Sequence, residues 1–309
     1  TDTGFGRDWD YQVVWNRPRH VDNAGNYYEK QLIEINGQKA KMVEGYTTDN
    51  YTDWAVDYIH GEHRDADKPW YLWVCYGAVH GPFTPADRHL DAYPDAKVDP
   101  PADIYPPRPG KPAYMQKVQS WVKGETGEPI LKSRNMATVE PKAGIHGETL
   151  TDWVRQYHQG VLAIDEGVGK IMAALKKSGQ LENTLVVFTS DQGFGWGQHG
   201  FQHKLAPYDA TIRSPLIVSM PGTIESGSVC KSPVGGVDLV PTFFQTAGID
   251  LPWEMHGHDL SPLLQDAQAD WPHSTLLSLT SRSYGSDTSK VPTDPAERDL
   301  VGIPWWVFL

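Results

Sequence analysis

The chain has 309 residues, of which 39% are apolar and 21% charged, a balance typical of a folded protein with a substantial core. Its net charge of -12 and the lack of any basic run argue against a nucleic-acid partner, because no surface is expected that neutralises phosphates. No apolar stretch reaches the length of a membrane span. The expected class is therefore one large α/β domain or two smaller domains.

The first predicted elements lie before residue 77. Residues 47–62 begin with threonines and aspartate and then carry apolar side chains at helical spacing, as at Trp54 and Tyr58, so they predict a helix. Residues 70–76, with the sequence WYLWVCY, are short and continuously apolar, which is typical of a buried strand. A helix followed by a buried strand is the start of an α/β pattern.

The middle of the chain repeats this alternation. Residues 151–177 carry apolar side chains every three or four positions and are followed by Gly179, so they predict a long helix with one buried face. Short apolar runs at 185–189 and 215–219 predict two strands, each bounded by turn residues.

The last predicted helix begins after Asp238, a good N-cap, runs through Phe244 and is closed by Gly248, and residues 275–279 form a further apolar run. Strands that alternate with helices predict a mostly parallel central sheet with helices on both faces. Residues 91–148 differ, because they are rich in proline and glycine and lack periodicity, which is typical of a loop-rich functional insertion.

The loop after the strand at 185–189 concentrates polar side chains in the sequence TSDQGFGWGQHGFQHK, residues 189–204. Asp191 and Gln192 come at the carboxyl end of a buried strand, where open α/β sheets bind ligands. A carboxylate and an amide oxygen suit a hard cation, and Ca²⁺ or Mg²⁺ fits better than zinc. The alternative is that Asp191 only caps the turn and Gln192 faces water.

Further polar side chains accompany this pair. His199, His203 and Lys204 follow within a few residues, and a cation with such donors can hold a tetrahedral anion, although each residue alone is as readily explained as solvated surface. His80 precedes the stiff pair Gly81-Pro82 after the run at 70–76. If the strands are parallel, His80 reaches the same sheet edge as Asp191; the alternative is a loop histidine satisfied by local bonds.

Four sequence blocks resemble, together and in order, the type I sulfatases of the alkaline-phosphatase superfamily. The blocks are AVHGPFTP, YHQGVLAIDEGVGKIMAALKKSGQLENTLVVFTSDQG, GQHGFQHKLAPYDATIRSPLIVSMPG, and VGGVDLVPTFFQTAGIDLP with GHDLSPLL. They cover most of the chain from about Trp70 to Leu264, so their co-occurrence is far more specific than any single motif. The resemblance implies an α/β sulfatase-like fold with a mostly parallel central sheet.

The resemblance also implies roles for individual residues. Asp191 and Gln192 match ligands of a single Ca²⁺. His80 and Lys204 match donors to the sulfate oxygens or to the leaving-group oxygen, and His199 matches the histidine of the family's G-E-H-G segment and is expected to be catalytic. Phosphatase and phosphodiesterase relatives commonly carry a histidine after this aspartate, so Gln192 favours Ca²⁺ and sulfate esters.

Parts of the family pattern are not found in this sequence. The family's nucleophile is a formylglycine made from Cys or Ser within C-x-P/A-x-R, and neither Cys75 nor Cys230 stands in that context. The Asp-Asp pair that completes the metal site is also missing. We therefore expect an internal portion of a longer sulfatase, with residues 1–270 in the catalytic domain and 271–309 beginning a smaller C-terminal subdomain, and expect the chain alone to be inactive.

The substrate class follows from the resemblance rather than from the residues. A sulfated carbohydrate is expected, and Trp196 could stack on a sugar or simply pack under its loop. The insertion at 91–148 could bind an anionic glycan through its basic residues Arg108, Lys111, Lys117 and Lys123. Ordinary surface charge explains these basic residues equally well. Export to the periplasm, cell surface or medium is expected on the same ground.

Two alternatives stay open. One is a phosphate or phosphonate ester hydrolase of the same superfamily, which would share the sheet and the donors His80 and Lys204. The other is a non-catalytic pseudoenzyme or binding module, which only the missing motifs favour.

Overall fold

The computed structural model describes residues 9–132, 149–204, 206–279, 294 and 306–308. The chain divides into two compact units, each built from two separate stretches of sequence. The first unit comprises residues 1–100 and 123–180, and the second comprises residues 101–122 and 181–309. The expected boundary at residue 270 stays a prediction, since most of the segment that follows it lies outside the described residues.

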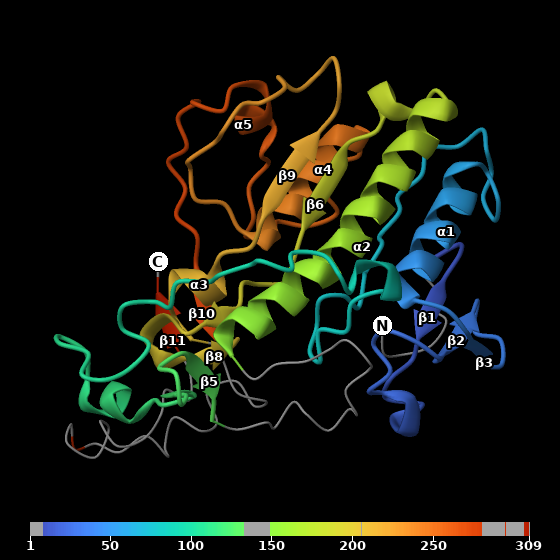
Figure 1. Ribbon diagram of the computed structural model, residues 1–309. Helices are drawn as coiled ribbons and strands as arrows, with labels where there is room; N and C mark the ends of the chain where they lie inside the picture. Colours follow the sequence, from blue (N-terminus) through green and yellow to red (C-terminus); the bar gives the residue numbers. More distant parts are fainter. Residues whose placement is uncertain (1–8, 133–148, 205, 280–293, 295–305, 309) are drawn as a thin grey trace. The chain divides into compact units, whose positions relative to one another are not determined.

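The first unit opens with a three-stranded antiparallel sheet, coloured blue in Figure 1. Its strands are β1 (Val13–Trp15), β2 (Gln31–Ile35) and β3 (Lys41–Val43), in that spatial order. This sheet was not predicted from the sequence, because each of its strands is short.

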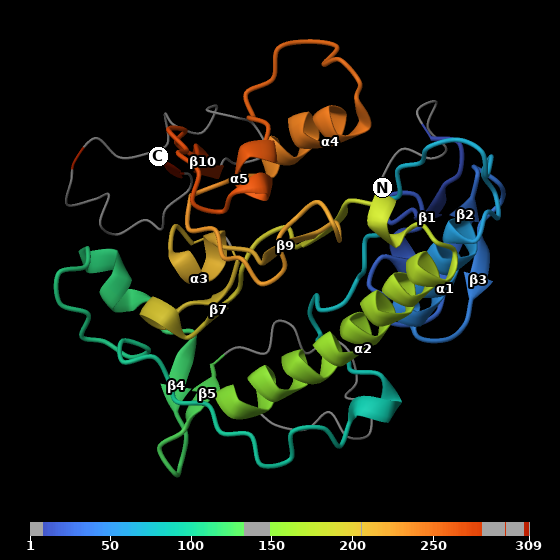
Figure 2. The same ribbon diagram turned by 90° about the horizontal axis from the view of Figure 1, so that it is seen from above.

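Two helices lie side by side in the first unit, as Figures 1 and 2 both show: α1 (Thr47–Ile59) and α2 (Leu150–Lys177). Both predicted helices are thereby confirmed. A capping box starts α2, because the Asp152 N–H donates to Thr149 Oγ1 at 3.1 Å and the Thr149 N–H donates back to the Asp152 carboxylate at 3.3 Å.

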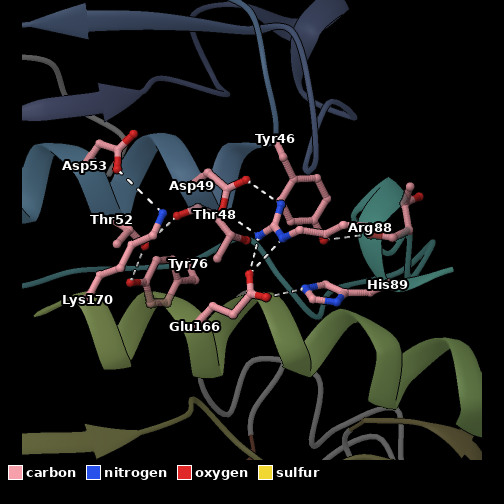
Figure 3. Close-up of polar contacts among 11 residues, drawn as sticks. Tyr46, Thr48, Asp49, Thr52, Asp53, Tyr76, Arg88, His89, Glu166 and Lys170 are labelled. Carbon is pink, nitrogen blue, oxygen red and sulfur yellow. Dashed lines mark hydrogen bonds and ion pairs between the residues drawn. The ribbon is translucent and has the colours of Figure 1, made fainter. Parts of the chain in front are cut away.

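An ion-pair network ties these two helices to the segment around residue 88 (Figure 3). The Arg88 guanidinium donates through Nη1 and Nη2 to the two carboxylate oxygens of Asp49, each at 2.8 Å, and its Nε donates to Glu166 Oε2 at 2.8 Å. Asp49 lies in the first turn of α1, where a carboxylate also interacts favourably with the helix dipole. One arginine thus links the N-terminal turn of α1 to the middle of α2.

The run at 70–76 differs from its prediction as a buried strand. No strand is assigned to it in the part of the chain that the structure describes, and Tyr71 and Trp73 are 53% and 65% exposed. The exposed residues alternate with half-buried ones, so the backbone follows the strand-like period but has one open face. A short apolar run predicts an extended backbone. Whether that backbone pairs into a sheet depends on a neighbouring strand, which the run itself does not specify.

The second unit is organised on a two-stranded sheet of β6 (Val186–Thr189) and β9 (Leu216–Ser219), which confirms both predicted strands. The two strands run antiparallel, with Val186 opposite Ser219 and Thr189 opposite Leu216. In the described residues, the pairs β1–β2, β2–β3 and β6–β9 are all antiparallel, so the expected parallel pairing is not seen in these sheets. The connection between β6 and β9 contains only short elements, so the chain turns back rather than crossing over on a long helix.

The one remaining helix prediction is confirmed in the second unit. α4 (Leu239–Ala247) begins after Asp238 and ends at Gly248, whose φ of +66° is the left-handed conformation of a C-cap. The buried Asp238 carboxylate accepts hydrogen bonds from the Gly235 N–H at 2.7 Å and from the His258 N–H at 2.8 Å, and makes no side-chain cap to α4. It therefore joins two loops instead of capping the helix.

The other elements are short. They are β4 (Trp121–Lys123), β5 (Pro129–Leu131), β7 (Gly195–Trp196), β8 (Gln202–His203), α3 (Asp209–Ile212), α5 (Ser261–Gln265), β10 (Leu277–Leu279), β11 (Trp306–Phe308) and the 3₁₀ turns η1 (Val21–Asn23), η2 (Asp87–His89), η3 (Ala113–Lys117), η4 (Leu181–Asn183), η5 (Gln198–Gly200) and η6 (Gly236–Asp238). Within the described residues, no helix is long and apolar enough to cross a membrane.

Candidate active-site loop

The loop after β6 brings together three of the residues singled out in the sequence. Lys204 Nζ lies 3.1 Å from Asp191 Oδ2, and the Gln192 N–H donates to Asp191 Oδ1 at 3.0 Å. Partial burial acts to raise the pKa of the Asp191 carboxyl, but the Lys204 ammonium and the Gln192 donors outweigh it, so the pKa lies below its usual value. Asp191 is therefore an ionised oxygen donor with a cation beside it.

A tight hairpin returns Lys204 to Asp191. Strands β7 and β8 pair antiparallel, with Gly195 opposite His203. At the start of this excursion Gly193 lies so close to the chain near α3 that an added Cβ would come within 2.3 Å of the Ala210 carbonyl oxygen. A side chain at this position would displace the backbone that follows Asp191, so the loop path requires glycine there.

Aromatic rings line one side of the hairpin. The ring centroids of Trp196 and Phe194 are 4.6 Å apart, and Phe194 stacks on His203 at 5.7 Å. Burial and then the neighbouring Lys204 lower the pKa of His203, so its ring is neutral at neutral pH. Trp196 is half-buried in this cluster, and its role against a sugar stays a prediction.

His199 is held by a residue that the sequence analysis missed. The Asp103 carboxylate accepts the His199 backbone N–H at 3.0 Å and lies 2.5 Å from ring Nδ1. Partial burial acts to raise the Asp103 pKa, but the His199 bonds and charge lower it below its usual value. No spacing in the sequence pointed to Asp103, because its partner lies 96 positions away in the chain.

Arg108 is not a substrate-reading base, contrary to the role considered for it in the sequence analysis. It is 1% exposed, and its guanidinium donates to backbone carbonyls of four residues at 2.5 to 2.9 Å. The acceptors are Asp103, Ile104, Met115 and Val118. These four bonds stabilise the loop around the guanidinium, and its burial keeps it out of reach of a ligand on the surface. Lys111 is also engaged, with Nζ 4.5 Å from the centroid of the Tyr208 ring.

His80 belongs to the first unit. Its ring stacks on Tyr27 with centroids 4.0 Å apart and an interplanar angle of 5°. Ring Nδ1 lies 2.8 Å from the Gly81 carbonyl oxygen, and the Tyr28 hydroxyl donates to the His80 carbonyl. Since Nδ1 is the donor to a carbonyl, a ligand of His80 would have to meet Nε2.

The donors present fit a hard cation only in part. Asp191 supplies carboxylate oxygens on a side chain that is 70% exposed, and Gln192 carries an amide oxygen. Among the described residues, no group of three or more His, Cys, Asp or Glu side chains could hold a metal. Asp191 and Gln192 could therefore provide two ligands of a cation, and the others would have to come from elsewhere.

Comparison with known proteins identifies the family. The family model described as Sulfatase matches residues 2–249, which is most of the chain. The chain belongs to the sulfatase family. The match confirms the resemblance that the four sequence blocks carry, and the α/β fold class with it.

Individual sulfatases are also similar to this chain. It is 32% identical to N-acetylglucosamine-6-O-sulfatase of Bacteroides thetaiotaomicron, over 83% of this chain and 53% of that protein. It is 28% identical to the extracellular sulfatase SULF-1 homolog of Drosophila melanogaster, over 82% of this chain and 22% of that protein. The chain thus spans about half the length of the first relative and less of the second.

Solved structures share the fold. One is a protein in complex with its substrate D-glucosamine-2-N,6-O-disulfate, with a TM-score of 0.67 and 27% identity, over 82% of this sulfatase chain and 60% of that chain. Another is a phosphonate monoester hydrolase from Silicibacter pomeroyi, with a TM-score of 0.58 and 24% identity, over 79% of this chain and 48% of that chain. The second likeness concerns the fold alone.

Proposed function

We propose that the complete protein hydrolyses a sulfate ester, and that its substrate is a sulfated carbohydrate of the glucosamine type. The observation that carries the proposal is the ion pair of Lys204 and Asp191 in the loop after β6, in a chain of the sulfatase family. The substrate class rests on the similarity to an N-acetylglucosamine-6-O-sulfatase and to a protein bound to a glucosamine disulfate.

The chain's own residues would act on the sulfate group by charge and hydrogen bonding. Lys204 would donate from its ammonium to a sulfate oxygen and neutralise charge that develops as the ester bond breaks. His80 would donate from Nε2, with Nδ1 held by the Gly81 carbonyl. Both residues remain proposals as substrate contacts.

Ca²⁺ is the cation we propose for Asp191 and Gln192, since both side chains offer oxygen donors, which Ca²⁺ prefers. When bound, Ca²⁺ would supply positive charge for the sulfate oxygens. The formylglycine nucleophile of the family has no precursor motif in this sequence. The 309 residues by themselves are therefore expected to release no sulfate.

We further propose that the protein is exported, because one relative is an extracellular sulfatase. Cell fractionation of the source organism, followed by immunodetection of the chain, tests this. Recovery of the protein only from the cytosolic fraction would contradict export.

One experiment separates the proposed activity from its alternatives. The enzyme expressed from its complete coding region is assayed on N-acetylglucosamine-6-O-sulfate, on a phosphate monoester and on a phosphonate monoester. We expect sulfate release to be fastest. Preferred turnover of either phosphorus ester would establish the alternative hydrolase activity, and binding of the sulfated sugar without turnover would establish the pseudoenzyme.

A further inference from the structure

The Asp103 carboxylate contacts His199 at two points within the second unit. One carboxylate oxygen accepts the backbone N–H at 3.0 Å, and the other lies 2.5 Å from ring Nδ1. His199 has a φ of +55°, a left-handed conformation that non-glycine residues rarely adopt. The double contact thus fixes both the backbone and the ring of a residue whose conformation needs support.

The segment that carries Asp103 is itself braced against the same turn. Arg108 donates to the Asp103 carbonyl at 2.7 Å, and its Nη2 occupies the space beside Gly200, where an added Cβ would come within 1.9 Å. Trp121, 1% exposed, donates from its indole to the Phe201 carbonyl at 3.1 Å. These buried contacts make residues 101–122 a rigid support for the turn that holds His199.

The contact also determines which ring nitrogen of His199 can do chemistry. A carboxylate only accepts hydrogen bonds, so the Nδ1 atom beside Asp103 carries the proton of that bond. Any hydrogen bond or proton exchange with another group then takes place at Nε2. Paired Asp and His side chains act in this way in hydrolases, where the acid orients the imidazole and selects its tautomer.

We propose that Asp103 is a positioning residue for the hydrolysis of the sulfate ester. Its carboxylate engages Nδ1 of His199 in a hydrogen bond, so that Nε2 faces the substrate. This inference rests on the proposed function. The proposed role of the 91–148 insertion thus differs from the one considered from the sequence. Its residue Asp103 would support the side chain of His199, and its basic residues would not be needed to bind the glycan.

The test compares Asp103→Asn and Asp103→Ala in the enzyme expressed from its complete coding region. The amide keeps one acceptor oxygen and the alanine none, so kcat should fall by about 10-fold to 100-fold, and more in the alanine variant. KM should change little, because Asp103 is not expected to touch the substrate. Asp99→Asn, an exposed acid four residues earlier, is the matched control and should leave both constants unchanged.

A second measurement does not depend on turnover. In ¹⁵N-histidine NMR of the wild-type protein, the His199 ring, assigned with His199→Gln, should be protonated at Nδ1, and Asp103→Ala, which keeps no acceptor, should lose that signature. A wild-type ring protonated only at Nε2 overturns the proposal even if the variants fail to fold. An Nδ1 signal together with unchanged kcat in both variants also overturns it, because the pair would then only pin the loop. A wild-type enzyme that releases no sulfate refutes the proposed function instead.

Discussion

Lys204 Nζ lies 3.1 Å from Asp191 Oδ2, and these two residues mark the two ends of one hairpin excursion between β6 and α3. Lys204 is the more buried partner, with 24% of its side chain exposed against 70% for Asp191. The cation is thus held inside the loop, while the carboxylate faces outward. Such an arrangement can offer the carboxylate to a cation and the ammonium to an anion at neighbouring positions.

Replacing Lys204 should impair turnover. In the complete enzyme, Lys204→Ala removes one charged donor to the sulfate group, so we expect kcat to fall by about 100-fold to 1,000-fold. Lys177→Ala, at the exposed end of α2, is the control and should behave as wild type. The measurement is the rate of sulfate release at saturating substrate. A Lys204→Ala enzyme with wild-type kcat would contradict the proposal that Lys204 contacts the sulfate group.

The metal proposal predicts a specific response to chelation. Chelation by EGTA should abolish sulfate release by the complete enzyme, and added Ca²⁺ should restore it better than Zn²⁺, because Asp191 and Gln192 offer only oxygen. Asp191→Ala should raise the Ca²⁺ concentration needed for half-maximal activity. Activity that survives EGTA unchanged, with no Ca²⁺ detected in the protein, would contradict the Ca²⁺ site.

How far the sequence predicts this site depends on the range of each interaction. The segment 185–204 carries its own strand, turn and polar residues, so the convergence of Asp191 and Lys204 could be expected from local pattern. The Asp103–His199 pair could not, because two short polar side chains distant in the chain leave no periodic signal. Arg108 was misread for a related reason, since burial of a charged side chain by backbone carbonyls depends on a loop path that composition does not specify.

The fold shows the same division. Amphipathic spacing predicted α1 and α2 to within a few residues, because a helix satisfies its own backbone and needs only one buried face. Strand direction was harder, since β6 and β9 pair antiparallel and the run at 70–76 has no strand assigned. Pairing partners lie outside the local window in which the pattern is read.

Asp103 should make stability depend on acid pH. Its folded pKa lies below the unfolded value of 3.8, so the folded state binds the proton less well, and the stabilisation is complete above that value and is lost as the pH falls through the folded pKa. The free energy of unfolding should therefore fall more steeply below about pH 5 in wild type than in Asp103→Asn. Urea titrations across this range check it, and parallel curves for the two proteins would be the contrary result.

The Arg88 network should contribute modestly to stability. Hydrogen bonds with Asp49, and then with Glu166, raise the pKa of Arg88 against the effect of its burial, but the three side chains are 29% to 43% exposed. Because solvent screens such pairs, we expect Arg88→Met to cost only about 1 kcal/mol, less at high salt. Lys68→Met, which breaks the more exposed pair with Asp65, is the control and should cost less in urea unfolding.

Glycine at position 200 should be needed for contact as well as conformation. Gly200 and Gly222 have φ values of +79° and +83°, so alanine is conformationally strained at both, but only at Gly200 would the new Cβ meet another atom, Nη2 of the buried Arg108 at 1.9 Å. Gly200→Ala should therefore destabilise the protein by about 1 to 3 kcal/mol more than Gly222→Ala, the cost of overpacking a filled site.

Because the displaced guanidinium also donates to the Asp103 carbonyl, Gly200→Ala should lower kcat as Asp103→Asn does, while Gly222→Ala should not. Equal losses of stability in the two alanine variants would show that Arg108 can move aside without cost, and the segment would not be the rigid support that we assign to it.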